Sequence, residues 1–391
     1  ILTPNKIYLS NKSFSFSAAE IIANHLKQFN TIKYVDISDI IAGRHEDEAL
    51  KVLEVLCNSL NGNDLIEVNV SDNALGRKGI IACQNILQGK NLQKLYFCNN
   101  GLSAEASELI TEILLLGGCP PLEVLHFYNN MSGAAGAQSS SQLVSAARET
   151  LRDFRYSATR SGVEGCLPIA QALCQTCNLT HLDLSDNSFG EEVIESLAAA
   201  IAQQEKLISI NLRDGGLGED GTREILKSLR QSKCPLQNLD ISGNDLTDDI
   251  IPDLARYLKE TPTIQSISLD DSEFTIDGCR KLSQTLQTLP NLQTLSITTS
   301  QLTAGSVLLL AKAVSRVPSF RQLLVDGNEI CSAGVERIQK VLSDAGKELG
   351  KLDDNDEDGE DDLEEVEDED ATSPDDEETG LETDLSSLNV S

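Results

Sequence analysis

The sequence has 391 residues but no tryptophan, a single methionine and only 4% aromatic residues. This composition excludes a core built on large rings and favours one of leucine and isoleucine. No run of 18 apolar residues is present, which excludes a membrane-spanning helix. Basic residues are few, since 31 lysines and arginines face 62 acidic residues and leave a formal charge of −31. Nucleic-acid binding would need a basic face, so we expect a protein partner with a basic surface, and neither nucleic acid nor membrane insertion.

Catalytic motifs and secretion signals are also missing. The sequence contains no P-loop, no H-E-x-x-H, no G-x-S-x-G and no paired cysteine–histidine nucleophile. We therefore predict that the protein is not an enzyme on its own and has no cofactor or metal of its own. The first residues lack the basic flank and apolar core of a signal peptide, and the ten cysteines are scattered. We therefore expect reduced thiols in a cytoplasmic or nuclear protein.

The negative charge is concentrated at the carboxyl end. Residues 352–391 hold 20 of the 62 acidic residues and no lysine or arginine. This segment is short of apolar residues, so it cannot bury enough surface to fold alone. We predict a disordered acidic tail over residues 351–391, which serves either solubility or weak steering of a basic partner.

A repeated motif organises the rest of the chain. The segment Leu92–Leu102, LQKLYFCNNGL, fits the leucine-rich-repeat template L-x-x-L-x-L-x-x-N-x-L at every fixed position. Twelve apolar positions, which we take as strand centres, recur from Leu9 to Val325 at spacings of 27–33 residues, most often 28. Each unit is expected to hold a strand of about five residues and a helix of about 12. The sequence therefore predicts an α/β leucine-rich-repeat solenoid over residues 1–350, a horseshoe like that of ribonuclease inhibitor. Its parallel strands would lie on the concave face and its helices on the convex face.

Three local features depart from the regular pattern. The second repeat is five residues longer than the usual 28, and we place the excess in the strand-to-helix loop Asp39–Glu46. Such a loop lies on the rim of the horseshoe, the edge at which the strands end, where recognition usually takes place. Arg44 is the only lysine or arginine in that loop, and pairing with Asp39 or Glu46 would merely fix the loop. Ser132 and Ser161 replace apolar template residues, so their repeats are expected to be looser.

Asparagine, cysteine and histidine have structural interpretations. The template asparagine turns the chain by satisfying backbone groups with its side chain, whereas Asn99, the residue before it, is not required and its amide is expected to be free. Cys174-x-x-Cys177 has no second pair and is expected to pack without binding metal. His126 and His181 stand two repeats apart, so a shared metal ion is not expected.

Five segments carry a more specific resemblance. They are DISDIIAGRHEDEAL (Asp36–Leu50), VSDNALGRKG (Val70–Gly79), LYFCNNGLSAEA (Leu95–Ala106), LEVLHFYNNMSGAAGA (Leu122–Ala137) and DFRYSATRSGVEG (Asp153–Gly165). In this order they resemble the Ran GTPase-activating proteins, most of all the plant-type members. The resemblance runs from Ile7 to the tail and is strongest over residues 36–165. Plant-type members carry an N-terminal domain that targets the nuclear envelope and that the printed sequence does not contain.

The resemblance implies an activator of the small GTPase Ran in its GTP form, and a role in nucleocytoplasmic transport. GTP and Mg²⁺ would belong to the partner, and a ternary complex with a Ran-binding protein and an association with the nuclear envelope stay open. Asn99 would orient Ran's own catalytic glutamine without an arginine finger, and Arg44 would serve the interface and the loop geometry. The further contact candidates on the rim are Asp72, Asn73, Asn100, Asn129, Asn130 and Arg160.

The alternative is a binding module that activates nothing. Ribonuclease inhibitors also use repeats of this length on an acidic scaffold, and such a module would hold a basic enzyme across its concave face. The modest cysteine count and the position of the distinctive segments on the rim argue against this alternative.

Overall fold

Each repeat contributes one short strand and one helix. The computed structural model describes residues 4–367, which form one sheet of 13 parallel strands in chain order. The strands are β1 (Lys6–Tyr8), β2 (Tyr34–Asp36), β3 (Glu67–Asn69), β4 (Lys94–Tyr96), β5 (Val124–Tyr128), β6 (Asp153–Ser157), β7 (His181–Asp183), β8 (Ser209–Asn211), β9 (Asn238–Asp240), β10 (Ser266–Ser268), β11 (Thr294–Ser296), β12 (Gln322–Leu324) and β13 (Glu348–Leu349).

The helices follow the strands in alternation. They are α1 (Phe16–Leu26), α2 (Glu46–Ser59), α3 (Gly76–Leu87), α4 (Ala104–Leu115), α5 (Gly133–Ala146), α6 (Gly162–Leu173), α7 (Glu191–Ile201), α8 (Gly218–Ser232), α9 (Ile251–Glu260), α10 (Ile276–Leu286), α11 (Ala304–Ser315), α12 (Ser332–Asp344) and the short α13 (Glu364–Glu367). A 3₁₀ turn, Asp248–Ile250, precedes α9. Within residues 4–367 none of these helices has the length and apolar character needed to cross a membrane.

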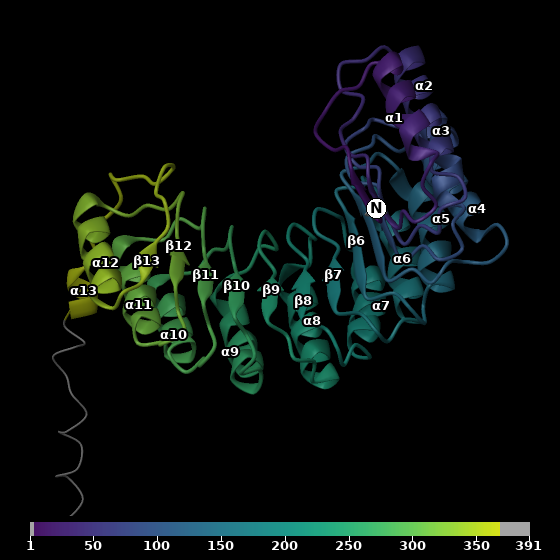
Figure 1. Ribbon diagram of the computed structural model, residues 1–391. Coiled ribbons are helices and arrows are strands. Elements are labelled where there is room, and N and C mark those ends of the chain that lie inside the picture. Colours follow the sequence, from purple (N-terminus) through teal and green to yellow (C-terminus); the bar gives the residue numbers. More distant parts are fainter. Residues whose placement is uncertain (1–3, 368–391) are drawn as a thin grey trace, which may run out of the picture.

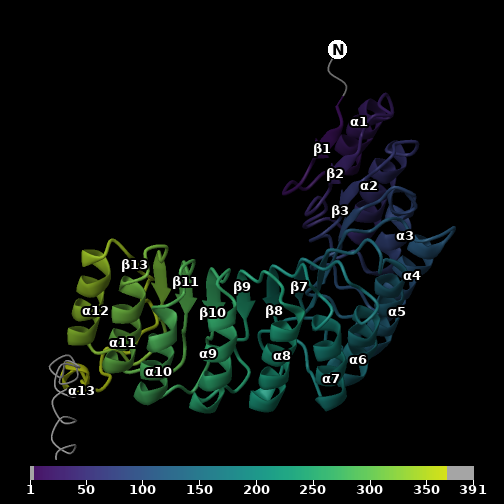
Figure 2. The ribbon, with the colours of Figure 1, turned by 90° about the horizontal axis from the view of Figure 1, so that it is seen from below.

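The arrangement is curved, with strands inside and helices outside (Figures 1 and 2). Neighbouring strands lie about 4.7–4.9 Å apart, whereas packed helices need about 8–10 Å, so the helical layer spreads and the sheet bends. The middle residue of each three-residue strand points inward, as Leu95 of β4 does, and is buried in one continuous apolar core. The predicted leucine-rich-repeat solenoid is confirmed.

The strands are shorter than predicted and are displaced along the chain. In ten repeats the strand ends one residue before the predicted centre, so Phe97 follows β4 as a buried residue of the turn. Only β5 and β6 extend over the predicted centres Phe127 and Tyr156. Hydrogen bonding to the next repeat nevertheless continues past these strand ends, since the Phe97 N–H donates to the His126 carbonyl oxygen at 2.9 Å.

The template asparagines turn the chain as predicted. Asn100 is fully buried, its Nδ2 donates to the Val70 carbonyl oxygen at 3.1 Å, and its Oδ1 accepts from the Asn73 N–H at 2.9 Å. Asn130 repeats the pattern one unit later, since its Oδ1 accepts from the Asn100 N–H at 3.1 Å. Where the template asparagine is present, it therefore links its turn to the preceding one and satisfies backbone groups that the sheet leaves unpaired.

The serines at the apolar template positions have a specific partner. Both are buried, and the Tyr156 hydroxyl lies 3.0 Å from Ser132 Oγ and 3.4 Å from Ser161 Oγ. Ser161 Oγ also lies 2.7 Å from Thr159 Oγ1. The repeats expected to be looser instead hold a buried polar cluster, because a tyrosine stands where neighbouring units have phenylalanine or leucine and needs hydroxyl partners.

Replacing Tyr156 with phenylalanine is expected to lower the free energy of unfolding by about 1–3 kcal/mol, because Ser132 Oγ then remains buried without a partner. The measurement is the urea midpoint followed by far-ultraviolet circular dichroism. Tyr8→Phe provides the control, since Tyr8 is 63% exposed and its hydroxyl faces solvent. Equal midpoints for all three proteins would contradict a stabilising role for the cluster.

The acidic segment after the last repeat is folded over its first part, which corrects the prediction of a disordered tail from residue 351. Residues 351–367 pack against the end of the solenoid, where Leu363 and Val366 are buried. Asp362 Oδ1 accepts from the Gly305 N–H at 2.6 Å, at the start of α11. The folded repeats supply the apolar surface that the segment could not provide alone, since α13 packs against α11. We call residues 351–367 the C-terminal cap; residues 368–391 lie outside the described part.

Candidate functional site

Three exposed polar residues follow one another along the rim of adjacent repeats. Asp72, Asn99 and Asn129 each stand directly before a buried template asparagine, with φ of 62°, 52° and 53°. The left-handed backbone turns their side chains away from the core and toward solvent. Their N–H groups donate to carbonyl oxygens of the next repeat, as Asn99 does to Tyr128 at 2.8 Å.

The three side chains form a hydrogen-bonded row, which we call the rim row. Asn99 Nδ2 donates to Asp72 Oδ1 at 2.9 Å, and Asn129 Nδ2 donates to Asn99 Oδ1 at 3.0 Å. The expectation that the Asn99 amide is free is therefore wrong, because both of its ends are engaged. One N–H and one lone pair of this carboxamide stay available on its exposed side.

The template asparagines among the contact candidates are not accessible. Asn73, Asn100 and Asn130 are between 0% and 3% exposed, and their side chains are committed to backbone groups. Their predicted role as contacts does not hold for the side chains, because the turn consumes all of their hydrogen-bonding groups.

Arg160 lies on the next repeat but does not extend the row. It is exposed with φ of 56°, and no side-chain partner for it is found among residues 4–367. The position equivalent to Asn99 in this repeat is Ala158, also left-handed, which has no polar side chain. The rim row therefore ends at Asn129.

The long loop is tied to the first repeat rather than to itself. Arg44 Nε donates to Ser13 Oγ at 2.9 Å, and its Nη1 lies 3.8 Å from Glu48 Oε2. The pairing of Arg44 with Asp39 or Glu46 is wrong, since Glu46 bonds Lys78 at 2.5 Å, and that hydrogen bond lowers the pKa of Glu46. The excess length of the second repeat is shared between this loop and α2, which has 14 residues.

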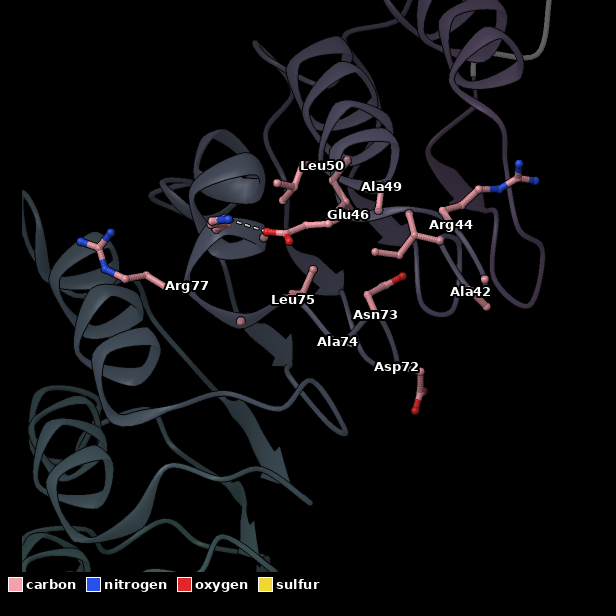
Figure 3. A pocket seen from close by; sticks show the side chains of 16 residues that line it. Ala42, Arg44, Glu46, Ala49, Leu50, Asp72, Asn73, Ala74, Leu75 and Arg77 are labelled. Carbon is pink, nitrogen blue, oxygen red and sulfur yellow. Dashed lines mark hydrogen bonds and ion pairs between the residues drawn. The ribbon is translucent and has the colours of Figure 1, made fainter.

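A pocket of about 620 Å³ opens between the long loop and the turn that leads into α3. Figure 3 shows Leu50 and Leu75 on its walls, Asp72 at one end, and the Arg44 side chain directed away from Asp72. Arg77 also extends away from the pocket. The pocket thus joins an apolar hollow to the acidic end of the rim row.

The concave face below the rim carries a second polar group, which is not among the predicted site residues. The Arg155 guanidinium lies 4.0 Å from the centre of the Tyr128 ring, and its Nε lies 3.0 Å from Asp183 Oδ2. His126 Nε2 lies 2.9 Å from Asp153 Oδ1. The strand register could have revealed this group, because it places Arg155 beside His126 in the pairing of β5 with β6.

No metal centre is found in the described part of the chain. Residues 4–367 contain no group of three or more histidine, cysteine or acidic side chains that could hold a metal ion. All ten cysteines are free; Cys177 is exposed, and Cys174 Sγ lies 3.2 Å from the Ser196 carbonyl oxygen. Burial raises the pKa of the Cys166 thiol to about 11, so this thiol stays protonated at neutral pH.

Two comparisons of the sequence, with a family model and with a ribonuclease inhibitor, agree with the fold. The Leucine Rich Repeat family model matches residues 178–199 and 235–257. A ribonuclease inhibitor of Sus scrofa is 25% identical over 198 residues, which cover 50% of this chain and 37% of that protein. A chain in the crystal structure of the Rad7 and Elc1 complex in yeast aligns over 86% of this chain and 88% of its own length, with a TM-score of 0.49 and 15% identity. The chain is a leucine-rich-repeat solenoid.

A higher identity is found over a shorter stretch. Two proteins of Arabidopsis thaliana, RAN GTPase-activating protein 1 and RAN GTPase-activating protein 2, are each 42% identical to this chain over 93 residues. The matched stretch covers 23% of this chain and only 17% of each relative.

Proposed function

We propose that this chain stimulates GTP hydrolysis by a Ran-type small GTPase, by placing the Asn99 carboxamide against the catalytic glutamine of the GTPase. The observation that carries the proposal is the geometry of Asn99, whose exposed carboxamide is held at the rim by hydrogen bonds to Asp72 and Asn129. The 42% identity to the two Arabidopsis thaliana proteins, named as activators of RAN, supports the choice of partner.

Such a mechanism is physically sufficient. Phosphoryl transfer needs placement of the attacking water and stabilisation of charge, with little covalent chemistry. A fixed carboxamide can hold another carboxamide through one donor and one acceptor, and the held glutamine then positions the water. In this mechanism the activator contributes no arginine finger: Arg44 is engaged with Ser13 and Glu48, and Arg160, which is exposed on the same rim, is tested separately below. GTP and Mg²⁺ would both belong to the partner.

The proposal extends to the cellular setting of that partner. Stimulating hydrolysis on a Ran-type GTPase would convert its GTP form to its GDP form and so support nucleocytoplasmic transport from the cytoplasm. A Ran-binding protein in a ternary complex and an association with the nuclear envelope are further parts of the proposal.

The direct test is single-turnover hydrolysis of GTP bound to Ran, with catalytic amounts of this chain. We expect acceleration by several orders of magnitude, since an activator that uses an arginine finger raises Ras turnover about 10⁵-fold. The signal is release of the γ-phosphate. No acceleration at any concentration of the chain, with Ran itself active toward a known activator, would overturn the proposal.

Replacing Arg44 with alanine is expected to raise the Ran·GTP concentration for half-maximal stimulation about tenfold, or about 1.4 kcal/mol. The long loop loses its hydrogen bond to Ser13 and its ion pair with Glu48, so the wall of the pocket moves. Kinetics at varied Ran·GTP measure the effect, and circular dichroism checks the fold. Arg148→Ala is the control, because Arg148 follows α5 at the edge opposite the rim. Unchanged kinetics for Arg44→Ala would show that the long loop does not contribute to the interaction with Ran.

A second function is favoured by the match to the ribonuclease inhibitor, which spans 50% of this chain. The concave group around Arg155 and Tyr128 has the residue types of a binding hot spot. In that case the chain would bind a basic enzyme tightly across its concave face and accelerate nothing. Binding of a pancreatic-type ribonuclease, without stimulation of Ran, would favour this second function.

A further inference from the structure

We propose that Asp72 and Asn129 are positioning residues, which set the direction in which the Asn99 carboxamide faces the partner. The nitrogen of Asn99 is held toward Asp72 and its oxygen toward Asn129. This inference rests on the proposed function and adds to it a direction: the partner glutamine meets one preset donor and one preset acceptor.

The donors and acceptors of the side chains determine the direction of the row. An ionised carboxylate accepts hydrogen bonds and cannot donate them, so Asp72 requires the nitrogen of Asn99 at its side. The 2.9 Å contact between Asp72 Oδ1 and Asn99 Nδ2 has this arrangement. The oxygen of Asn99 then faces Asn129, whose Nδ2 can donate. A reversed Asn99 would bring two acceptor oxygens together, which is repulsive.

The turn does not require these side chains. The same left-handed position is occupied by Ala158, Gly243, Thr299 and Gly327 in later repeats, where the sheet continues without interruption. Asp186 and Asp214 hold it in adjacent repeats, where two carboxylates cannot bond to each other. The fold therefore does not explain why Asn99 and Asn129 stand beside Asp72 in the rim row.

The backbone of the row is equally well held. The N–H groups of Asp72, Asn99 and Asn129 donate to the carbonyl oxygens of Cys98, Tyr128 and Ser157 at 2.9, 2.8 and 3.0 Å. These hydrogen bonds fix the Cα of each residue, and the hydrogen bond to a neighbouring side chain fixes the orientation of its own side chain. A carboxamide prepared in this way orders a partner group without further loss of its own freedom.

The experiment compares broken and reversed rows in single-turnover hydrolysis of Ran·GTP. Asp72→Ala breaks the row, and we expect the maximal stimulated rate to fall about 10- to 100-fold, with little change in half-saturation. The double variant Asp72→Asn with Asn129→Asp restores a full row of opposite direction, because the amide at position 72 would donate to Asn99 and Asn99 would donate to the carboxylate at position 129. We expect wild-type thermal stability and a similarly reduced rate. Asp186→Asn, the same exchange at an equivalent turn outside the row, is expected to leave the rate unchanged.

A merely structural role would give a different pattern, since the reversed row would then recover full activity together with stability. Full activity of the reversed row, or of Asp72→Ala, alongside an inactive Asn99→Ala, would overturn the inference while leaving the proposed function standing. Nuclear magnetic resonance tests the orientation of Asn99 separately from the stimulation of Ran. The side-chain amide signals of Asn99, identified by their loss in Asn99→Ala, should shift and exchange faster in Asp72→Ala whether or not Ran is stimulated. Unshifted signals would also overturn the inference.

Discussion

Replacing Asn99 with alanine is expected to lower the stimulated hydrolysis rate by about 10²–10³-fold, the loss typical of removing one transition-state hydrogen-bond donor from a preorganised site. Alanine occupies the same left-handed turn position in the repeat of Ala158, so the fold should persist. Binding of Ran·GTP should change little, because the carboxamide contributes one pair of hydrogen bonds to a larger interface. The measurements are the maximal stimulated rate and, separately, the affinity for Ran loaded with a non-hydrolysable GTP analogue.

Arg160→Ala is the informative companion, because Arg160 is exposed on the same rim without a side-chain partner in the described part of the chain. An arginine-finger mechanism would make the Arg160 variant inactive and leave the Asn99 variant active. The proposed mechanism predicts that Asn99→Ala has the larger effect on the maximal rate. Wild-type stimulation by Asn99→Ala would show that Asn99 does not orient the catalytic glutamine.

Ending the chain after Gly350 is expected to lower the free energy of unfolding by about 3–5 kcal/mol, since burial of an aliphatic side chain contributes about 1.5–3 kcal/mol. The truncation removes the buried side chains of Leu363 and Val366, whose segment packs against α11, and the Asp362 carboxylate that accepts from the Gly305 N–H. It also exposes the apolar surface that Leu363 and Val366 cover, so self-association should rise. Urea unfolding measures the first effect and analytical ultracentrifugation the second.

The matched control ends the chain after Glu367, which keeps the C-terminal cap and removes only the residues that follow it. That variant should unfold at the midpoint of the full chain. If both truncations unfold at the same midpoint, the cap contributes nothing to stability and its contacts are incidental.

The sequence predicts the solenoid well because its determinants repeat. A leucine lost from one unit leaves the spacing of the others readable, and the template asparagine performs the same task in unit after unit, as Asn73 and Asn100 do. The position of Asn99 on the rim also follows from the template. What the periodicity lacks is contact between side chains of different units.

Contacts between side chains of different units explain each prediction that was wrong. Arg44 bonds Ser13, which lies 31 residues earlier in an atypical repeat, and Asn99 is engaged by residues 27 and 30 positions away. The hydroxyl of Tyr156 finds Ser132 across a unit boundary. The acidic cap was predicted to be disordered from its own composition, but its folding depends on contacts with the repeats, above all with α11.

The uniform sheet has a consequence for distance. The rim row lies in the units of β3 to β5, whereas the cap closes the array beyond β13, and each unit in between contacts its neighbours along the chain. Adding or removing one such unit would move the C-terminal cap by about one strand spacing, 4.7–4.9 Å along the sheet, without touching Asn99. The number of later repeats thus sets the distance between the rim row and the C-terminal cap.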